Sequence, residues 1–144
     1  MCGISGIIST NKVNYFNLDL MSDSLNHRGP DFKANWFSED YKIAFAHNRL
    51  SILDLSEKAN QPMISKNKRY VISFNGEIYN FRMLKNHLDN IKVINWSSTS
   101  DTEVLLELIS HYGIQKSLEL VNGMFAFSVY DKSDKTTYLC RDRL

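Results

Sequence analysis

The C-terminal third of the chain carries a hairpin pattern, and this pattern limits the fold more than any other feature. Residues 124–130 and 136–140 are two strand-like runs, and the polar segment 131–135 between them is typical of a turn. Two strands joined in this way are antiparallel. Earlier in the chain, segments with helix and strand patterns follow one another without strict alternation. The sequence therefore predicts an α+β fold in which sheets and helices pack as layers.

Three earlier segments also have strand character. They are apolar or rich in β-branched and aromatic residues, and they comprise residues 3–8, 42–47 and 70–74. The first of them contains Gly3 and Gly6, which permit close approach of a neighbouring backbone.

Three segments have the apolar spacing of helices. One covers residues 18–25 and is expected to end before the turn-like run 27–31. Another covers residues 81–88, with Asn80 as a possible N-cap. The clearest start lies at Ser100, because Ser100 and Glu103 have the spacing of a capping box. Gly113 is placed to close this third helix.

The composition is that of a globular protein. The chain has 144 residues, of which 43% are hydrophobic and 23% charged, and its net charge is +1 with both signs interspersed. Neither nucleic acid nor a membrane is therefore expected as a partner. A secretory signal is not expected, because the N-terminus has no basic segment followed by an apolar run. A membrane-spanning helix is not expected either, because no apolar stretch approaches about 20 residues. Two cysteines, Cys2 and Cys140, cannot form a disulfide framework, so a cytoplasmic location is expected.

Cys2 directly follows the initiator methionine. Removal of Met1 would place a thiol and a free α-amine on the same residue. The α-amine has an ordinary pKa of about 7.7–8.0 and the thiol of about 8.5, so the amine can act as general base for the thiol. Judged by its position alone, Cys2 is better explained as a small apolar residue that begins a strand. The other motifs of the chain favour Cys2 as a nucleophile instead.

Seven runs, in this order, resemble the N-terminal glutaminase domain of glutamine-hydrolysing asparagine synthetases and their close relatives. They are residues 1–7, 27–31, 49–55, 61–63, 74–80, 100–103 and 122–127. The resemblance covers nearly all of the chain, and residues 141–144 match the first part of a longer family motif. These proteins are class II glutamine amidotransferases, in which an N-terminal cysteine is the nucleophile.

The resemblance implies an N-terminal-nucleophile hydrolase fold, an αββα sandwich with two antiparallel sheets between helical layers. Residues 1–144 would be one glutamine amidotransferase type-2 domain, incomplete at its C-terminal end and without the synthetase domain. No metal or cofactor is expected for the glutaminase; ATP and Mg²⁺ would belong to the missing domain. Glutamine is the expected substrate, the synthetase domain the expected partner, and a homodimer is a possible assembly.

The resemblance also assigns three catalytic residues. Cys2 would attack the side-chain amide of glutamine, and the side-chain amide of Asn75 and the N–H of Gly76 would stabilise the oxyanion. Taken from the residues alone, Asn75-Gly76 is instead a turn between a strand and a helix. Both interpretations can hold together.

Five further residues are assigned to substrate binding by the same resemblance. Arg49 would hold the α-carboxylate, Asp101 would accept the α-ammonium with help from Glu77, and backbone groups near Leu50 and Ile52 would line the pocket. Without the resemblance, Arg49 is better explained by a surface ion pair. Asp101 is then an acid in the first turn of a helix.

Other polar residues are expected to have supporting roles. Arg28 and Asp31 would hold the loop near Cys2. The four histidines are expected to be structural or solvated, and their scatter argues against metal binding; they are His27, His47, His87 and His111.

Four interpretations of the chain are compatible with these observations. The first is glutamine hydrolysis that supplies ammonia to an asparagine synthetase domain. The second is the same glutaminase with another acceptor, in surface-polysaccharide or secondary metabolism. The third is a fragment that binds glutamine without turnover, and the fourth is an unstable fragment with no role of its own.

Overall fold

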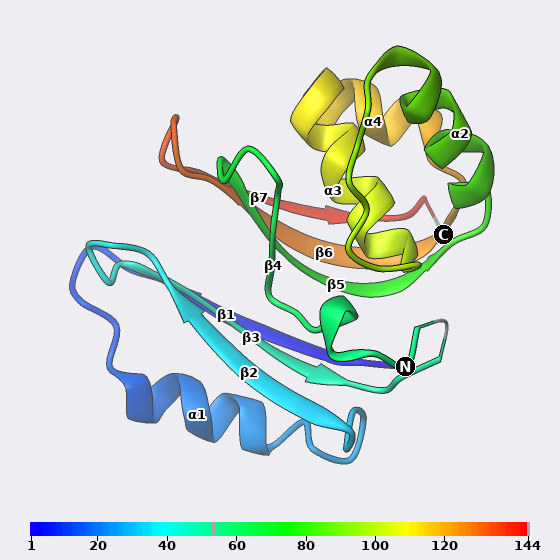
Figure 1. The fold of residues 1–144 in the computed structure, drawn as a ribbon. Helices are drawn as coiled ribbons and strands as arrows, with labels where there is room; N and C mark the ends of the chain where they lie inside the picture. The colour runs from blue at the N-terminus through cyan, green and yellow to red at the C-terminus, as the bar shows by residue number, and fades with distance from the viewer. Residues whose placement is uncertain (53, 144) are drawn as a thin grey trace.

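The computed structural model describes residues 1–52 and 54–143. Leu53 and Leu144, which belong to two of the runs quoted above, lie outside the described residues. Figure 1 shows two sheets packed face to face with helices on both outer sides. The layers therefore follow the order helix, sheet, sheet, helix, and the predicted α+β sandwich is confirmed.

The first sheet has three antiparallel strands in the order β1-β3-β2, with one helix on its outer face. These elements are β1 (Gly3–Ile8), β2 (Phe32–Phe37), β3 (Ile43–Arg49) and α1 (Tyr15–Asp23). Leu18 of α1 is buried against Ala44 and Ala46 of β3. The small side chains of the two alanines let the helix lie close to the sheet.

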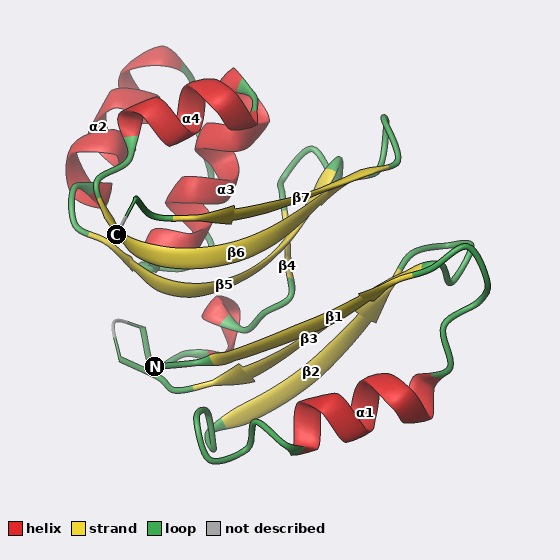
Figure 2. Ribbon diagram, turned by 180° about the vertical axis from the view of Figure 1, so that it is seen from behind, coloured by secondary structure: helices red, strands yellow, loops and turns green. Residues whose placement is uncertain are grey.

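The second sheet has four antiparallel strands in the order β4-β5-β6-β7, and three helices cover its outer face (Figure 2). The strands are β4 (Met63–Ile64), β5 (Tyr70–Ile78), β6 (Gly123–Asp131) and β7 (Thr136–Arg141). The helices are α2 (Phe81–Ile91), α3 (Asp101–Tyr112) and α4 (Ile114–Leu120), and a short 3-10 helix spans Glu57–Ala59. The main core lies between this sheet and its helices and includes Phe74, Leu88, Leu108 and Phe127.

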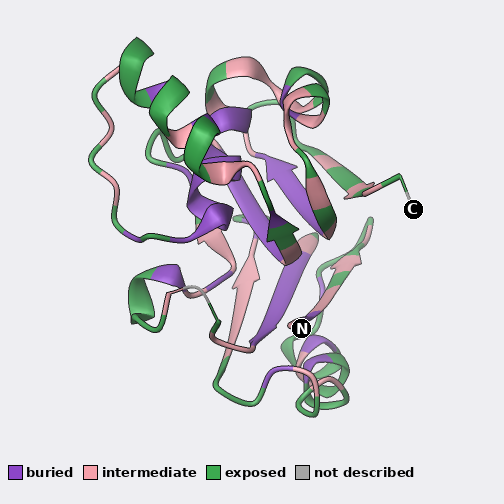
Figure 3. Cartoon of the chain, turned by 90° about the vertical axis from the view of Figure 1, so that its right-hand side faces the viewer, coloured by how far each residue is buried: buried purple, intermediate pink, exposed green. Residues whose placement is uncertain are grey.

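A smaller apolar cluster joins the two sheets. It contains Phe45 of β3, Val71 of β5 and Tyr130 of β6, with Trp36 packed against them. Figure 3 shows that the central strands are mostly buried. In the part of the chain that the structure describes, no helix is long and apolar enough to cross a membrane.

Strand β5 is longer than the sequence predicts. It continues through Asn75 and Gly76 to Ile78, so the expected turn at Asn75-Gly76 is wrong. The reason is pairing with β6, whose residues remain opposite β5 as far as the pair Ile78 and Gly123. Backbone pairing over this whole length outweighs the turn preference of an Asn-Gly pair.

The predicted helices are present, with two differences in detail. Helix α1 covers Tyr15–Asp23 instead of residues 18–25. Helix α3 is capped by the Ser100 side chain and closed by Gly113, as expected. The Asn80 side chain, however, does not cap α2; it donates to the Leu120 carbonyl and accepts from the Asn122 N–H. Strands β2 and β4 and helix α4 are not predicted by the sequence patterns.

Candidate active site

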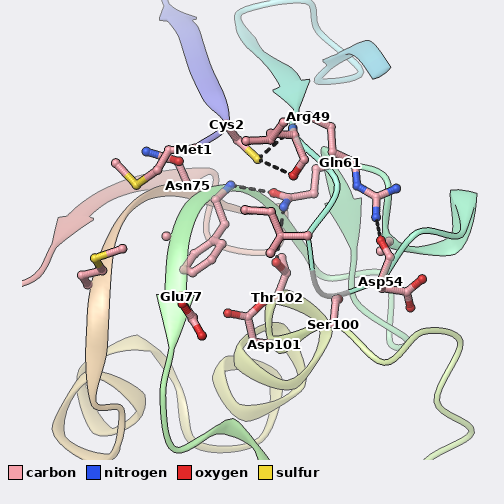
Figure 4. A pocket seen from close by; sticks show the side chains of 16 residues that line it. Met1, Cys2, Arg49, Asp54, Gln61, Asn75, Glu77, Ser100, Asp101 and Thr102 are labelled. Atoms are coloured by element: carbon pink, nitrogen blue, oxygen red, sulfur yellow. Dashed lines mark hydrogen bonds between the residues drawn. The ribbon is translucent and has the colours of Figure 1, made fainter. Parts of the chain in front are cut away.

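All eight residues that the resemblance assigns to the site line one cavity of about 110 Å³. They are Cys2, Arg49, Leu50, Ile52, Asn75, Gly76, Glu77 and Asp101. The cavity lies where the end of the first sheet meets β5 and the start of α3 (Figure 4). The fold thus brings together side chains that are up to 99 positions apart in the sequence, from residue 2 to residue 101.

The Cys2 thiol is held by the backbone of the loop that follows β3. Its Sγ lies 3.3 Å from the Leu50 nitrogen, which donates to it, and 3.7 Å from the Leu50 oxygen, to which it donates. From the other side, Arg28 Nε donates to the Cys2 carbonyl at 3.1 Å. These contacts fix the residue at the rim of the cavity, immediately before β1.

Alternate N–H groups of β5 point to the edge of the strand that faces β4 and the start of α3. The Phe74 N–H donates to Gln61 Oε1 at 2.7 Å, and the Ile78 N–H donates to Asp101 Oδ2 at 2.8 Å. In an antiparallel strand, every second residue directs its N–H to the same side. The N–H of Gly76 therefore points to the same edge, between two N–H groups that already have acceptors.

Gly76 is required by its backbone conformation and its surroundings. Its φ is +155°, and a Cβ placed there would lie 2.3 Å from the Met124 carbonyl oxygen. Next to it, Asn75 Oδ1 is buried and has no hydrogen-bond partner among the described residues. An amide nitrogen offers two donors, so Asn75 and Gly76 can together present N–H groups to an oxygen in the cavity.

Arg49 is buried, with 7% of its surface exposed, at the end of β3. Its Nη1 donates to the Ser56 carbonyl at 2.8 Å and to Asn60 Oδ1 at 2.7 Å, and its Nη2 donates to the Asp54 carbonyl. A surface ion pair is therefore the wrong explanation for this residue. Because these partners are neutral oxygens, none of them offsets the positive charge of the guanidinium in the cavity wall.

Two carboxylates lie on another side of the cavity from Arg49 (Figure 4). Asp101, at the first position of α3, is 5% exposed, and burial raises its pKa above the ordinary value. The nearby negative charge of the exposed Glu77 adds to this rise. Asp101 therefore fits both interpretations given above: it is an acid in the first turn of a helix, and it also lines the cavity. Opposite charges on two sides suit a zwitterionic amino acid.

Comparison with known proteins gives a family match over the whole chain. Residues 1–144 match the glutamine amidotransferase domain family. The chain belongs to this family.

Relatives of this amidotransferase chain include asparagine synthetases. It is 36% identical to asparagine synthetase [glutamine-hydrolyzing] 2 of Bacillus subtilis, over 99% of this chain and 19% of that protein. It is 37% identical to a putative asparagine synthetase [glutamine-hydrolyzing] 2 of Methanocaldococcus jannaschii, over all of this chain and 30% of that protein. The chain thus spans less than a third of the length of these two relatives.

A solved structure of the B. subtilis glutamine phosphoribosylpyrophosphate amidotransferase, complexed with ADP and GMP, shares the fold. The TM-score is 0.78 at 22% identity, over 99% of this chain and 37% of that one. The prediction of an N-terminal-nucleophile hydrolase fold is confirmed.

The supporting contacts predicted for this amidotransferase near Cys2 are also present. Asp31 Oδ2 accepts from the Ser51 N–H at 2.7 Å, which holds the loop after β3. The run 27–31 approaches β3 closely at Gly29, where a Cβ would lie 2.1 Å from the Asn48 carbonyl oxygen.

His47 has a structural position in the amidotransferase fold. It is fully buried in β3, and its Nε2 lies 3.1 Å from the Phe74 carbonyl oxygen, across the two sheets. Burial lowers the pKa of its imidazole to about 4. Among the described residues, no group of three or more His, Cys, Asp and Glu side chains could hold a metal ion.

The sequence analysis missed two further pairs around the amidotransferase cavity. Gln61 Nε2 donates to Thr102 Oγ1 at 3.3 Å, and Asp54 accepts from Thr99. Gln61 and Asp54 both lie in runs that carry the resemblance. The sequence gives no signal, however, for which residue each of them contacts.

Proposed function

We propose that this chain hydrolyses glutamine to glutamate and ammonia, with Cys2 as the nucleophile once Met1 has been removed. The proposal rests mainly on one observation: a half-buried thiol next to the chain end shares one cavity with amide donors and with groups of both charge signs. A thiol, an oxyanion site and a zwitterion-binding site are the three elements that hydrolysis of an amino-acid amide needs.

In the proposed reaction, the α-amine of Cys2 takes the thiol proton, and Sγ attacks the side-chain carbonyl carbon of glutamine. The Asn75 side-chain amide and the Gly76 N–H donate hydrogen bonds to the oxyanion. The protonated amine then gives its proton to the departing ammonia, which leaves a thioester on Cys2. Water attacks the thioester with the amine again as base, and glutamate is released.

Substrate recognition would use the charges on the two sides of the cavity. Arg49 would hold the α-carboxylate, which adds an anionic partner to a guanidinium that now bonds only neutral oxygens in the described structure. Asp101 and Glu77 would hold the α-ammonium, and the backbone near Leu50 and Ile52 would complete the wall.

We further propose that residues 1–144 act as one type-2 amidotransferase domain whose ammonia serves asparagine formation in the cytoplasm. The asparagine synthetases among its relatives support this acceptor. ATP and Mg²⁺ would be used by a separate synthetase domain. Glutaminase activity without asparagine formation, when the full-length protein is given aspartate and ATP, would contradict this acceptor and leave the glutaminase proposal intact.

The glutaminase proposal is tested by intact mass followed by labelling with 6-diazo-5-oxo-norleucine, an electrophilic analogue of glutamine. We expect loss of Met1 and a single adduct on Cys2 that glutamine prevents. The variant Cys140→Ala should label like the parent, and Cys2→Ala should not label. A folded chain without Met1 that forms no adduct would contradict the assignment.

A further inference from the structure

Strand β4 is much shorter than the strand it pairs with. Only Met63 and Ile64 pair with β5, opposite Ile72 and Val71. Beyond that point the edge of β5 is continued by a side chain, because Gln61 Oε1 accepts the Phe74 N–H at 2.7 Å. An N–H needs an acceptor, so the chemistry of this contact fixes the orientation of the Gln61 amide.

The other end of the same amide reaches helix α3. Gln61 Nε2 donates to Thr102 Oγ1 at 3.3 Å, and both side chains are buried, with 6% of Gln61 and 3% of Thr102 exposed. Phe74 immediately precedes Asn75, and Thr102 immediately follows Asp101. One buried amide therefore joins the strand that carries the oxyanion donors to the helix turn that carries the acid (Figure 4).

We propose that Gln61 is a positioning residue that sets the distance between the oxyanion site of Asn75 and Gly76 and the acid Asp101. The inference rests on the proposed glutaminase function. Gln61 acts through Phe74 and Thr102 and takes no part in proton transfer. The reaction needs the scissile amide and the α-ammonium of one glutamine held at the same time, so a change in this distance lowers turnover.

Two variants separate the parts of this link. Gln61→Met keeps the length of the side chain and removes both hydrogen bonds. Gln61→Glu keeps an oxygen for the Phe74 N–H, and the Thr102 hydroxyl can turn to donate to the second oxygen.

The matched control is Asn80→Leu. Asn80 is also an amide with two hydrogen bonds, each of 2.9 Å, to the Leu120 carbonyl and from the Asn122 N–H. It does not line the cavity, so its loss should affect stability alone.

Each variant is checked for Met1 removal by intact mass, and kcat and KM for glutamine are then measured together with thermal unfolding. We expect kcat of Gln61→Met to fall about 10- to 100-fold. Gln61→Glu should restore most of that loss, and Asn80→Leu should lower the melting temperature without changing kcat. Alkylation of Cys2 by iodoacetamide, which needs no oxyanion site, should stay at the parent rate in all three.

Two results would overturn the proposal. One is a Gln61→Met variant that melts earlier, like Asn80→Leu, but keeps the parent kcat. The other is unchanged hydrogen exchange at the Phe74 and Gly76 amides in Gln61→Met, since a positioning role requires faster exchange there. The exchange measurement tests the positioning role of Gln61 even if the parent chain has no glutaminase activity. In that case the proposed function fails, and faster exchange still supports the link made by Gln61.

Discussion

The carboxylate of Asp54 accepts two hydrogen bonds from Thr99, one from the backbone N–H at 2.7 Å and one from the hydroxyl at 3.0 Å. Asp54 belongs to the loop after β3, which carries Leu50 and Ile52. Thr99 lies just before α3, which begins at Asp101. The pair therefore ties together two segments that form different sides of the cavity.

We expect Asp54→Ala to raise KM for glutamine about two- to fivefold, because a partly exposed contact contributes modestly. The Thr99 N–H and the neighbouring Ser56 groups hold the pKa of Asp54 well below its usual range. The contact is therefore present at neutral pH and is lost only in strong acid. Steady-state kinetics test this, with Glu57→Ala, an exposed acid in the 3-10 helix that follows the loop, as control. An equal rise in KM for both variants would contradict a specific role of Asp54.

Asn75→Ala is expected to lower kcat about 10²- to 10³-fold and to change KM little, because an oxyanion donor acts mainly in the transition state. Steady-state glutamine hydrolysis at saturating substrate measures this loss. A large rise in KM at unchanged kcat would instead make Asn75 a ground-state binding residue.

Asp101→Asn keeps an oxygen for the Ile78 N–H and removes the negative charge. KM for glutamine should rise about 10- to 100-fold, since hydrogen bonds to charged groups contribute about 1.5–3 kcal/mol. Burial raises the pKa of Asp101, so in the parent chain glutamine binding should weaken as pH falls toward that raised value. The pH dependence of kcat/KM should lose this acidic limb in the variant. If the acidic limb persists in Asp101→Asn, the limb must arise from the titration of another group.

The stability of the fold should decrease between about pH 6.5 and 4 because of His47. Its folded pKa of about 4 lies below the ordinary value of 6.5, so the unfolded chain binds more protons in this window. The full contribution is present above pH 6.5 and amounts to about 3 kcal/mol, at 1.36 kcal/mol for each pKa unit. Denaturant unfolding at several pH values should show a smaller slope in His47→Gln. His27→Gln, at an exposed position, is the matched control for the loss of a histidine.

Gly76→Ala should destabilise the chain by more than about 2 kcal/mol, because it combines an unfavourable φ with a contact of 2.3 Å to the Met124 carbonyl oxygen. Gly113→Ala is the matched comparison. Its φ is +78°, but a Cβ there meets nothing within 4 Å, so only the backbone cost of about 1–2 kcal/mol applies. Equal losses in chemical denaturation would show that the contact at residue 76 is relieved by a small shift.

Local patterns predicted the elements better than their arrangement. The capping spacing at Ser100 and the hairpin after residue 123 follow from rules that act over a few residues, and both were right. The turn expected at Asn75-Gly76 was wrong because its outcome depends on β6, about 50 positions later. The layered sandwich itself came from the family resemblance, since no local pattern encodes which sheet faces which.

The site shows the same division. Motifs indicated which residues line the cavity, but not the contacts that hold them, such as Gln61 with Phe74 or Asp54 with Thr99. These contacts join residues that are 13 and 45 positions apart. They exist only because β4 stops early and because the loop after β3 meets the segment before α3.

The two-residue repeat of β5 makes the cavity sensitive to chain length. Residues 74, 76 and 78 direct their N–H groups to the edge, while the N–H groups of the residues between them point to β6. Inserting or deleting one residue within this stretch would exchange the two sets and turn the residue-76 amide toward β6. A two-residue change would keep the parity. Insertions and deletions in β5 are therefore tolerated only in even numbers of residues, in addition to the limits that the side-chain chemistry sets.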